Sequence, residues 1–174
     1  MTSAFAVQLN GCLGRHRRNG ILLDTNVLLL LVVSQFQPSL IGGKRLEKYV
    51  PDDAELLAAY VGQFDRILTT SHILAETSNL ASQALSGRRK LELFAELFPL
   101  FCMGPNAFHQ CSIESARIDP ITFTRYGLTD AGVVLTAGAN GLLLTDDLDL
   151  HLAALKGGAD SINFTHMREA AGLL

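Results

Sequence analysis

Ile21-Leu22-Leu23-Asp24-Thr25-Asn26 is the stretch of sequence that decides the fold. Its apolar first half predicts a short strand buried on both faces, as in a parallel sheet covered by helices. Asp24 and the two polar residues after it provide side-chain oxygens that can accept hydrogen bonds from the first amides of a helix. We therefore expect a strand that ends at Asp24 and leads into a helix through Val33.

The same alternation of short apolar runs and longer helical patterns continues along the chain. Further strands are expected at residues 67–70, 142–144 and 162–164. Helices are expected at about residues 52–65, 71–87, 88–101, 127–137 and 151–156, whereas residues 34–51 indicate a loop or a partly helical insertion and residues 107–125 are ambiguous. Strands that alternate with helices predict an α/β fold with a mostly parallel sheet.

The length of the chain, 174 residues, is that of one domain with a substantial core. We expect residues 20–174 to form this domain and residues 1–19 to be a partly ordered N-terminal extension. Hydrophobic residues make up 48% of the sequence and charged residues 18%, which excludes a disordered protein.

The formal net charge of −3 excludes the overall positive field of a basic nucleic-acid-binding domain. Any such binding would be local, and residues 15–18 and 88–90 are two short basic stretches, although runs of this length are more often solvated surface. The three cysteines form no C-x-x-C pair, so we expect neither a disulfide framework nor a zinc site, and a reducing cytoplasm fits. Polar residues interrupt the most apolar stretch, residues 21–33, so no membrane segment is expected.

Acidic residues occur at the ends of the predicted strands and the starts of the predicted helices. Asp24 follows one strand, and the Asp146-Asp147-x-Asp149 cluster follows another. Glu76 and Asp130 lie early in helices. These positions can meet at the carboxyl edge of a parallel sheet, where α/β proteins form their sites. Converging carboxylates need a positive counter-charge, and their hard oxygens suit Mg²⁺ or Mn²⁺, ions that promote phosphodiester hydrolysis.

At these residues the chain resembles the PIN-domain family over roughly residues 20 to 165. The matching motifs, in order along the chain, are Leu23–Val27, Ile73–Glu76, Leu128–Ala131 and Leu144–Asp149. The resemblance implies a three-layer α/β/α sandwich and a metal-dependent endoribonuclease activity. It also implies residue roles: catalysis and metal binding by Asp24, Glu76, Asp130 and Asp147, additional metal binding by Asp149, and orientation of the carboxylates by Asn26 and Thr145.

The resemblance further implies an RNA substrate and a homodimer. It includes the VapC-type toxins, which cleave RNA and are silenced by a cognate antitoxin protein. The chain departs from those compact toxins in its N-terminal extension, in a longer segment between Asp24 and Glu76, and in Leu150, where the toxins usually have an aromatic residue. These differences bear on the toxin role more than on the nuclease role.

Three alternatives are weighed against this interpretation. Asp146 competes with Asp147 for the fourth acidic position, although the T-x-D-x-D spacing favours Asp147. A catalytically silent PIN-like module that binds RNA or a protein partner would need no complete set of acids. A receiver-type signalling domain needs a lysine after its last strand, where this chain has Thr165-His166.

Overall fold

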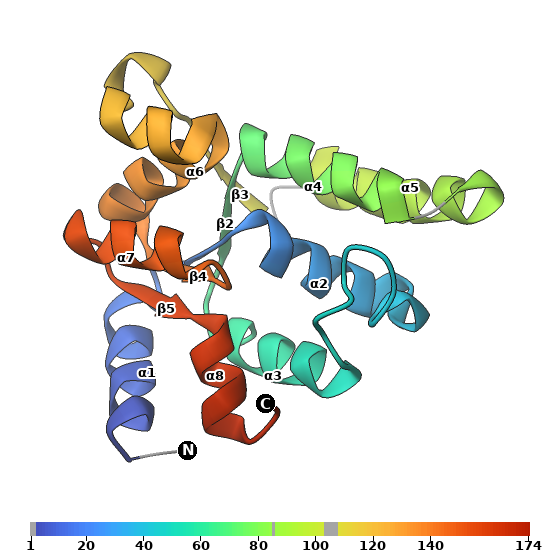
Figure 1. Cartoon of the computed structure of the whole chain (residues 1–174), viewed down its shortest axis with the longest axis horizontal. Helices are drawn as coiled ribbons and strands as arrows, with labels where there is room; N and C mark the ends of the chain where they lie inside the picture. The colour runs from blue at the N-terminus through green and yellow to red at the C-terminus, as the bar shows by residue number, and fades with distance from the viewer. Residues whose placement is uncertain (1–2, 85, 103–107) are drawn as a thin grey trace.

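The computed structural model describes residues 3–84, 86–102 and 108–174. Its centre is one parallel sheet of five strands in the order β3-β2-β1-β4-β5 (Figure 1). The strands are β1 (Ile21–Leu23), β2 (Ile67–Thr70), β3 (Phe108–Cys111), β4 (Leu142–Thr145) and β5 (Ser161–Asn163). The predicted α/β class with a parallel sheet flanked by helices is confirmed.

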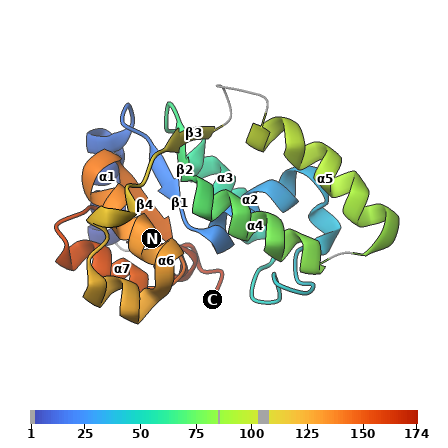
Figure 2. The same ribbon diagram turned by 90° about the horizontal axis from the view of Figure 1, so that it is seen from above.

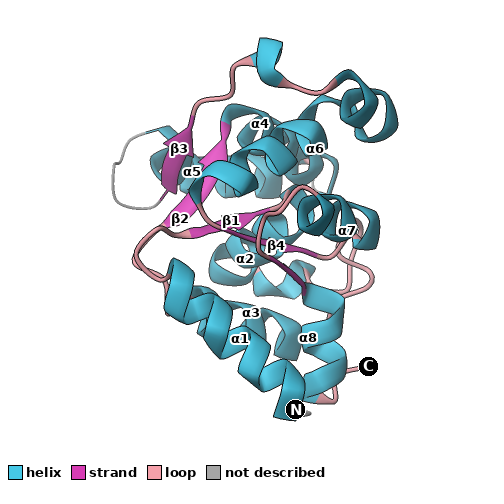
Figure 3. Ribbon diagram, turned by 90° about the vertical axis from the view of Figure 1, so that its left-hand side faces the viewer, coloured by secondary structure: helices cyan, strands magenta, loops and turns pink. Residues whose placement is uncertain are grey.

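Helices make up most of the remaining chain and cover the sheet from both sides. Their bounds are α1 (Ser3–His16), α2 (Thr25–Phe36), α3 (Pro51–Val61), α4 (Ser71–Ala84), α5 (Gly87–Cys102), α6 (Pro120–Asn140), α7 (Leu148–Lys156) and α8 (Phe164–Ala171), with short 3-10 turns η1 (Pro38–Leu40) and η2 (Ser115–Arg117). Figure 3 shows α4 and α6 on one side of the sheet and α1, α3 and α8 on the other. The view from above in Figure 2 shows α4, α6 and α7 lying over the strands.

The middle of the sheet positions the candidate site. Strands β1 and β4 are neighbours although about 120 residues separate them, because the strand order reverses there. All side chains of β1 and of β4 are buried, and every residue of α2 from Val27 to Val33 is buried as well. These leucine- and valine-rich segments bring the residues that follow β1 and β4 to one edge of the sheet.

The structure corrects several expectations about the elements. Residues 3–16, part of the expected N-terminal extension, form a regular helix, α1, whose Leu9 and Cys12 are buried in the core. Burial of one apolar side of α1 explains this order, since helices are stabilised mainly by tertiary packing. Helix α5 continues through Pro99 to Cys102, close to the predicted bounds.

Further corrections concern the ambiguous region and the end of the chain. Residues 108–111 form the edge strand β3, which has too little apolar alternation to be recognised in the sequence. Helix α6 begins at Pro120, capped by Asp119, and is bent at Gly127, whose φ of 80° is not helical. Phe164 begins the unpredicted helix α8 instead of ending β5, because Asn163 caps that helix.

Two observations concern the predictions about membranes and cysteines. Within residues 3–84, 86–102 and 108–174, no helix is long and apolar enough to cross a membrane. Cys12 and Cys111 are free thiols. The side chain of Cys102 lies outside the described part of the structure.

Candidate active site

Asp24 lies at the carboxyl end of β1 and is buried. Its Oδ1 accepts a hydrogen bond from the amide of Val27 at 2.8 Å and thereby caps α2, as the sequence predicts. Its Oδ2 accepts from the Thr145 hydroxyl and from the amide of Asp146, the latter at 3.2 Å. Burial first, and the nearby Asp146 charge second, raise the pKa of Asp24 to about 7 despite these donors.

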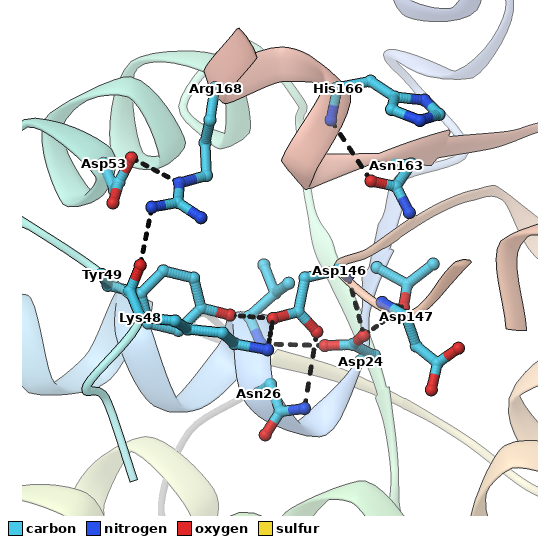
Figure 4. Close-up of polar contacts among 12 residues, drawn as sticks. Asp24, Asn26, Lys48, Tyr49, Asp53, Asp146, Asp147, Asn163, His166 and Arg168 are labelled. Carbon is cyan, nitrogen blue, oxygen red and sulfur yellow. Dashed lines mark hydrogen bonds and ion pairs between the residues drawn. The ribbon is translucent and has the colours of Figure 1, made fainter. Parts of the chain in front are cut away.

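Asp146 follows β4 and faces Asp24. Its side chain is only 3% exposed. Oδ1 accepts from the Asn26 amide nitrogen at 3.4 Å, while Oδ2 accepts from the Tyr49 hydroxyl and forms an ion pair with the Lys48 ammonium (Figure 4). Between these two neighbouring strand ends the structure thus places a pair of carboxylates, with one lysine as their direct counter-charge.

A second acidic group lies beside this pair. Burial raises the pKa of Asp130 to about 6, and the charges of Glu76 and Asp147 contribute to that rise, so the three carboxyl groups are close in space. Glu76 also accepts a hydrogen bond from the Thr25 hydroxyl at 3.3 Å, which ties it to the residue after Asp24. The four acids expected from the sequence, together with Asp146, therefore lie at one edge of the sheet.

Asp147 and Asp149 are placed differently from Asp146. Asp147 caps α7 by accepting from the Leu150 amide at 3.0 Å, and its carboxylate lies on the side of Asp24 away from Lys48 (Figure 4). Asp149 is directed toward Arg125, 3.9 Å away, and its side chain is 70% exposed. Thr145 and Asn26, the two residues expected to orient carboxylates, do contact Asp24 and Asp146 respectively. Asp146 is thus the direct neighbour of Asp24, whereas Asp147 lies near Glu76 and Asp130.

The short segment Leu46–Val50, here named the Lys48 strap, lies over the Asp24–Asp146 pair. Its Tyr49 is buried and packs against Phe164, with ring centroids 6.2 Å apart. Arg168 of α8 donates to the backbone oxygen of Lys48 at 2.6 Å and forms an ion pair with Asp53 at 2.7 Å (Figure 4). Contacts with the distant helix α8, supported by Asp53 at the start of the adjoining α3, therefore fix the strap over the acids.

The chemistry of these donors fits a hard divalent cation. The groups are carboxylate oxygens, which such a cation prefers as ligands. Burial first, and the charges of neighbouring acids second, raise the pKa values of Asp24 and Asp130. Within the described ranges, however, no three or more His, Cys, Asp and Glu side chains are arranged so that they could hold a metal ion. Metal binding would therefore require side chains to move, for example Asp147 from its capping amide or Asp146 from Lys48.

The sequence matches no family model, and comparison with curated proteins and with solved structures finds no match. The geometry of the site and the acidic motifs are therefore the observations that bear on function.

Lys48, Tyr49 and Arg168 were not identified as site residues from the sequence. Lys48 and Tyr49 lie in a segment with no regular pattern, and Arg168 lies in a helix that the sequence pattern did not indicate. The one signal that could have found them is the length of the segment between Asp24 and Glu76, because a long insertion beside a site can fold back over it.

Proposed function

We propose that this protein is a Mg²⁺- or Mn²⁺-dependent endoribonuclease of the PIN type. The observation that carries the proposal is the cluster of carboxyl groups where the strand order reverses. Within it, the buried Asp24 has a pKa of about 7 beside Asp146, and Asp130 has a pKa of about 6 beside Glu76 and Asp147. Raised pKa values caused by burial and by like charges are typical of functional sites.

In this proposal the acids hold a divalent cation and the residues around them orient the acids. The Thr145 hydroxyl and the Val27 amide fix the Asp24 carboxylate, and Asn26 orients Asp146. Glu76, Asp130 and Asp147 provide the remaining oxygen ligands, and a proton lost by water can pass to one of these carboxylates. The bound cation would neutralise the acids and lower the pKa of a water molecule that attacks the phosphodiester.

The alternative is a catalytically silent PIN-like module that binds RNA or a protein. One observation favours it: Lys48 already neutralises Asp146, so part of the acidic charge is compensated without a metal. The charge of Lys48 nevertheless leaves four further acids at the same edge, two of them with raised pKa values. We therefore prefer the nuclease.

The substrate class is tested directly by incubating the protein with Mn²⁺ and either single-stranded RNA or single-stranded DNA of the same sequence. We expect internal cleavage of the RNA, abolished by a chelator, and little cleavage of the DNA. Binding of RNA without cleavage at any Mn²⁺ concentration would favour the silent module, and a preference for DNA would contradict the ribonuclease.

As part of this proposal we expect the protein to form a homodimer and to be cytoplasmic. If it is a toxin, we also expect an antitoxin partner. Exposed apolar side chains on α6 and α7 support a dimer: Ile121, Phe123, Leu128, Leu148, Leu152 and Leu155. Apolar surfaces of this kind commonly mark protein interfaces. The growth arrest expected of a toxin would require intact Asp24.

The dimer is expected to show in light scattering as a particle of twice the chain mass of 18.8 kDa. Ile121→Asp places a charge on the most exposed of these side chains and should shift the particle to the monomer. Val7→Asp, at another exposed apolar position on α1, is the matched control and should leave the dimer intact. A monomer at all concentrations would contradict the dimer.

A further inference from the structure

The Lys48–Asp146 ion pair differs from an ordinary surface pair. The Lys48 side chain is 53% exposed, whereas the Asp146 side chain is 3% exposed, so the ammonium covers a buried carboxylate from the solvent side. Asp24 lies beside Asp146, because its Oδ2 accepts a hydrogen bond from the Asp146 backbone amide at 3.2 Å. Lys48 thus contributes a positive charge at the place where the proposed function requires a cation (Figure 4).

The acceptor positions of Asp146 are largely used by this arrangement. A carboxylate offers about four lone-pair positions. Asp146 uses three of them, for the Asn26 amide, the Tyr49 hydroxyl and the Lys48 ammonium. Lys48 and Tyr49 share the same oxygen, Oδ2. A divalent cation that approaches this carboxylate therefore meets an oxygen that already has a positively charged partner.

The backbone of Lys48 is fixed by the contacts of the strap, so only its side chain is free to move. Arg168 binds the Lys48 backbone oxygen, and its guanidinium carbon lies 5.4 Å from the centroid of the Tyr49 ring. Asp53 accepts from the Val50 amide at 2.8 Å and pairs with Arg168. These contacts hold the Lys48 backbone beside Asp146, which favours the ion pair by reducing the entropy lost when it forms.

We propose that Lys48 is a further functional residue of this site, one that competes with the divalent cation for Asp146, and that Arg168 is a positioning residue that keeps Lys48 there through the strap. The inference deepens the proposed function and rests on it. This competition would lower the affinity of the site for the cation, because the cation must displace the Lys48 ammonium from Asp146. At low metal concentration Lys48 would keep Asp146 neutralised.

Titration of Mn²⁺ into the metal-free protein by calorimetry tests the competition without measuring activity. Lys48→Met should bind Mn²⁺ about fivefold more tightly than the wild type, the effect of removing one partly exposed ion pair. Lys48→Arg keeps the charge and should stay within about twofold of the wild type. Lys44→Met, an equal change at an exposed position of the neighbouring chain, is the matched control and should leave the affinity unchanged.

Thermal melting of the same proteins gives a second readout. The Lys48→Met change should lower the melting temperature without metal and enlarge the rise in melting temperature that Mn²⁺ causes. Without metal, Lys48→Met should melt at a lower temperature than the wild type, because Asp146 and Asp24 then repel each other without a counter-charge. Saturating Mn²⁺ should raise the melting temperature of Lys48→Met by more than that of the wild type. If Lys48 had a purely structural role, its replacement would lower the melting temperature without metal but would leave the rise caused by Mn²⁺ the same as in the wild type.

The outcomes separate this inference from the proposed function. If the wild type and Lys48→Met bind Mn²⁺ with equal affinity, or if Lys44→Met has the same effect as Lys48→Met, the competition is wrong and the metal site stands. If none of these proteins binds Mn²⁺, the proposed metal site is wrong and the inference fails with it.

Discussion

Asp24→Asn is expected to reduce RNA cleavage by about a thousandfold or more. Asp24 is a buried carboxylate of the site, and removal of its charge costs the site several kcal/mol of stabilisation for a bound cation. The measurement is the initial rate of cleavage of a labelled single-stranded RNA at saturating Mn²⁺. Asp65→Asn, a charge change at a half-exposed acid that precedes β2, is the control and should retain full activity.

The same substitution should change the pH dependence of stability. The native pKa of Asp24 is about 7, while an unfolded aspartate titrates near 3.9. Between these values the native state binds more protons than the unfolded state, so the free energy of unfolding falls as pH rises from about 4 to about 7. The asparagine at position 24 of the Asp24→Asn variant cannot ionise, so the free energy of unfolding of the variant should not fall for this reason.

Urea denaturation at pH 5 and pH 8, with a chelator present, measures this effect. The free energy of unfolding of Asp24→Asn minus that of the wild type should be about 2–3 kcal/mol larger at pH 8 than at pH 5. At pH 8 its stability should equal or exceed that of the wild type, although the variant loses the acceptor for the Asp146 amide. A difference between the two proteins that does not change with pH would show that Asp24 is an ordinary carboxylate.

The parts of the fold that the sequence predicts are those with local causes. The run Ile21–Leu23 and the cap at Asp24 lie within a few residues of each other, and both are found in the structure as expected. Strand β3 and the first half of α6 have weak local patterns, and their positions depend on pairing with β2 and on the bend at Gly127. Such tertiary causes cannot be read from a short window of sequence.

The candidate site divides in the same way. Asp24, Glu76, Asp130 and the acids after β4 follow from the rule that parallel strands carry their sites at one edge. The spacing favours Asp147 over Asp146, but it does not indicate that Asp146 turns toward the strap while Asp147 caps α7. Lys48 and Asp146 lie far apart in the sequence, and they meet because contacts of Tyr49, Arg168 and Asp53 hold the strap at this place.

The buried pair of Arg168 and Asp53 supports the last prediction, which concerns stability. Arg168 and Asp53 have side chains that are 7% and 0% exposed, and their atoms approach to 2.7 Å. Arg168→Met leaves the Asp53 charge buried without its partner, so we expect a loss of about 3–5 kcal/mol, or roughly 10 °C in melting temperature.

A surface pair of the same geometry provides the comparison that isolates burial. Arg15 and Asp160 approach to 2.8 Å, but their side chains are 57% and 36% exposed, so Arg15→Met should cost less than about 1 kcal/mol. Asp53→Asn added to Arg168→Met should recover part of the loss, because the amide removes the buried charge and its oxygen can still accept from the Val50 amide. Equal losses for Arg168→Met and Arg15→Met would mean that the buried pair does not anchor the strap, and the fixed position of Lys48 over Asp146 would then need another cause.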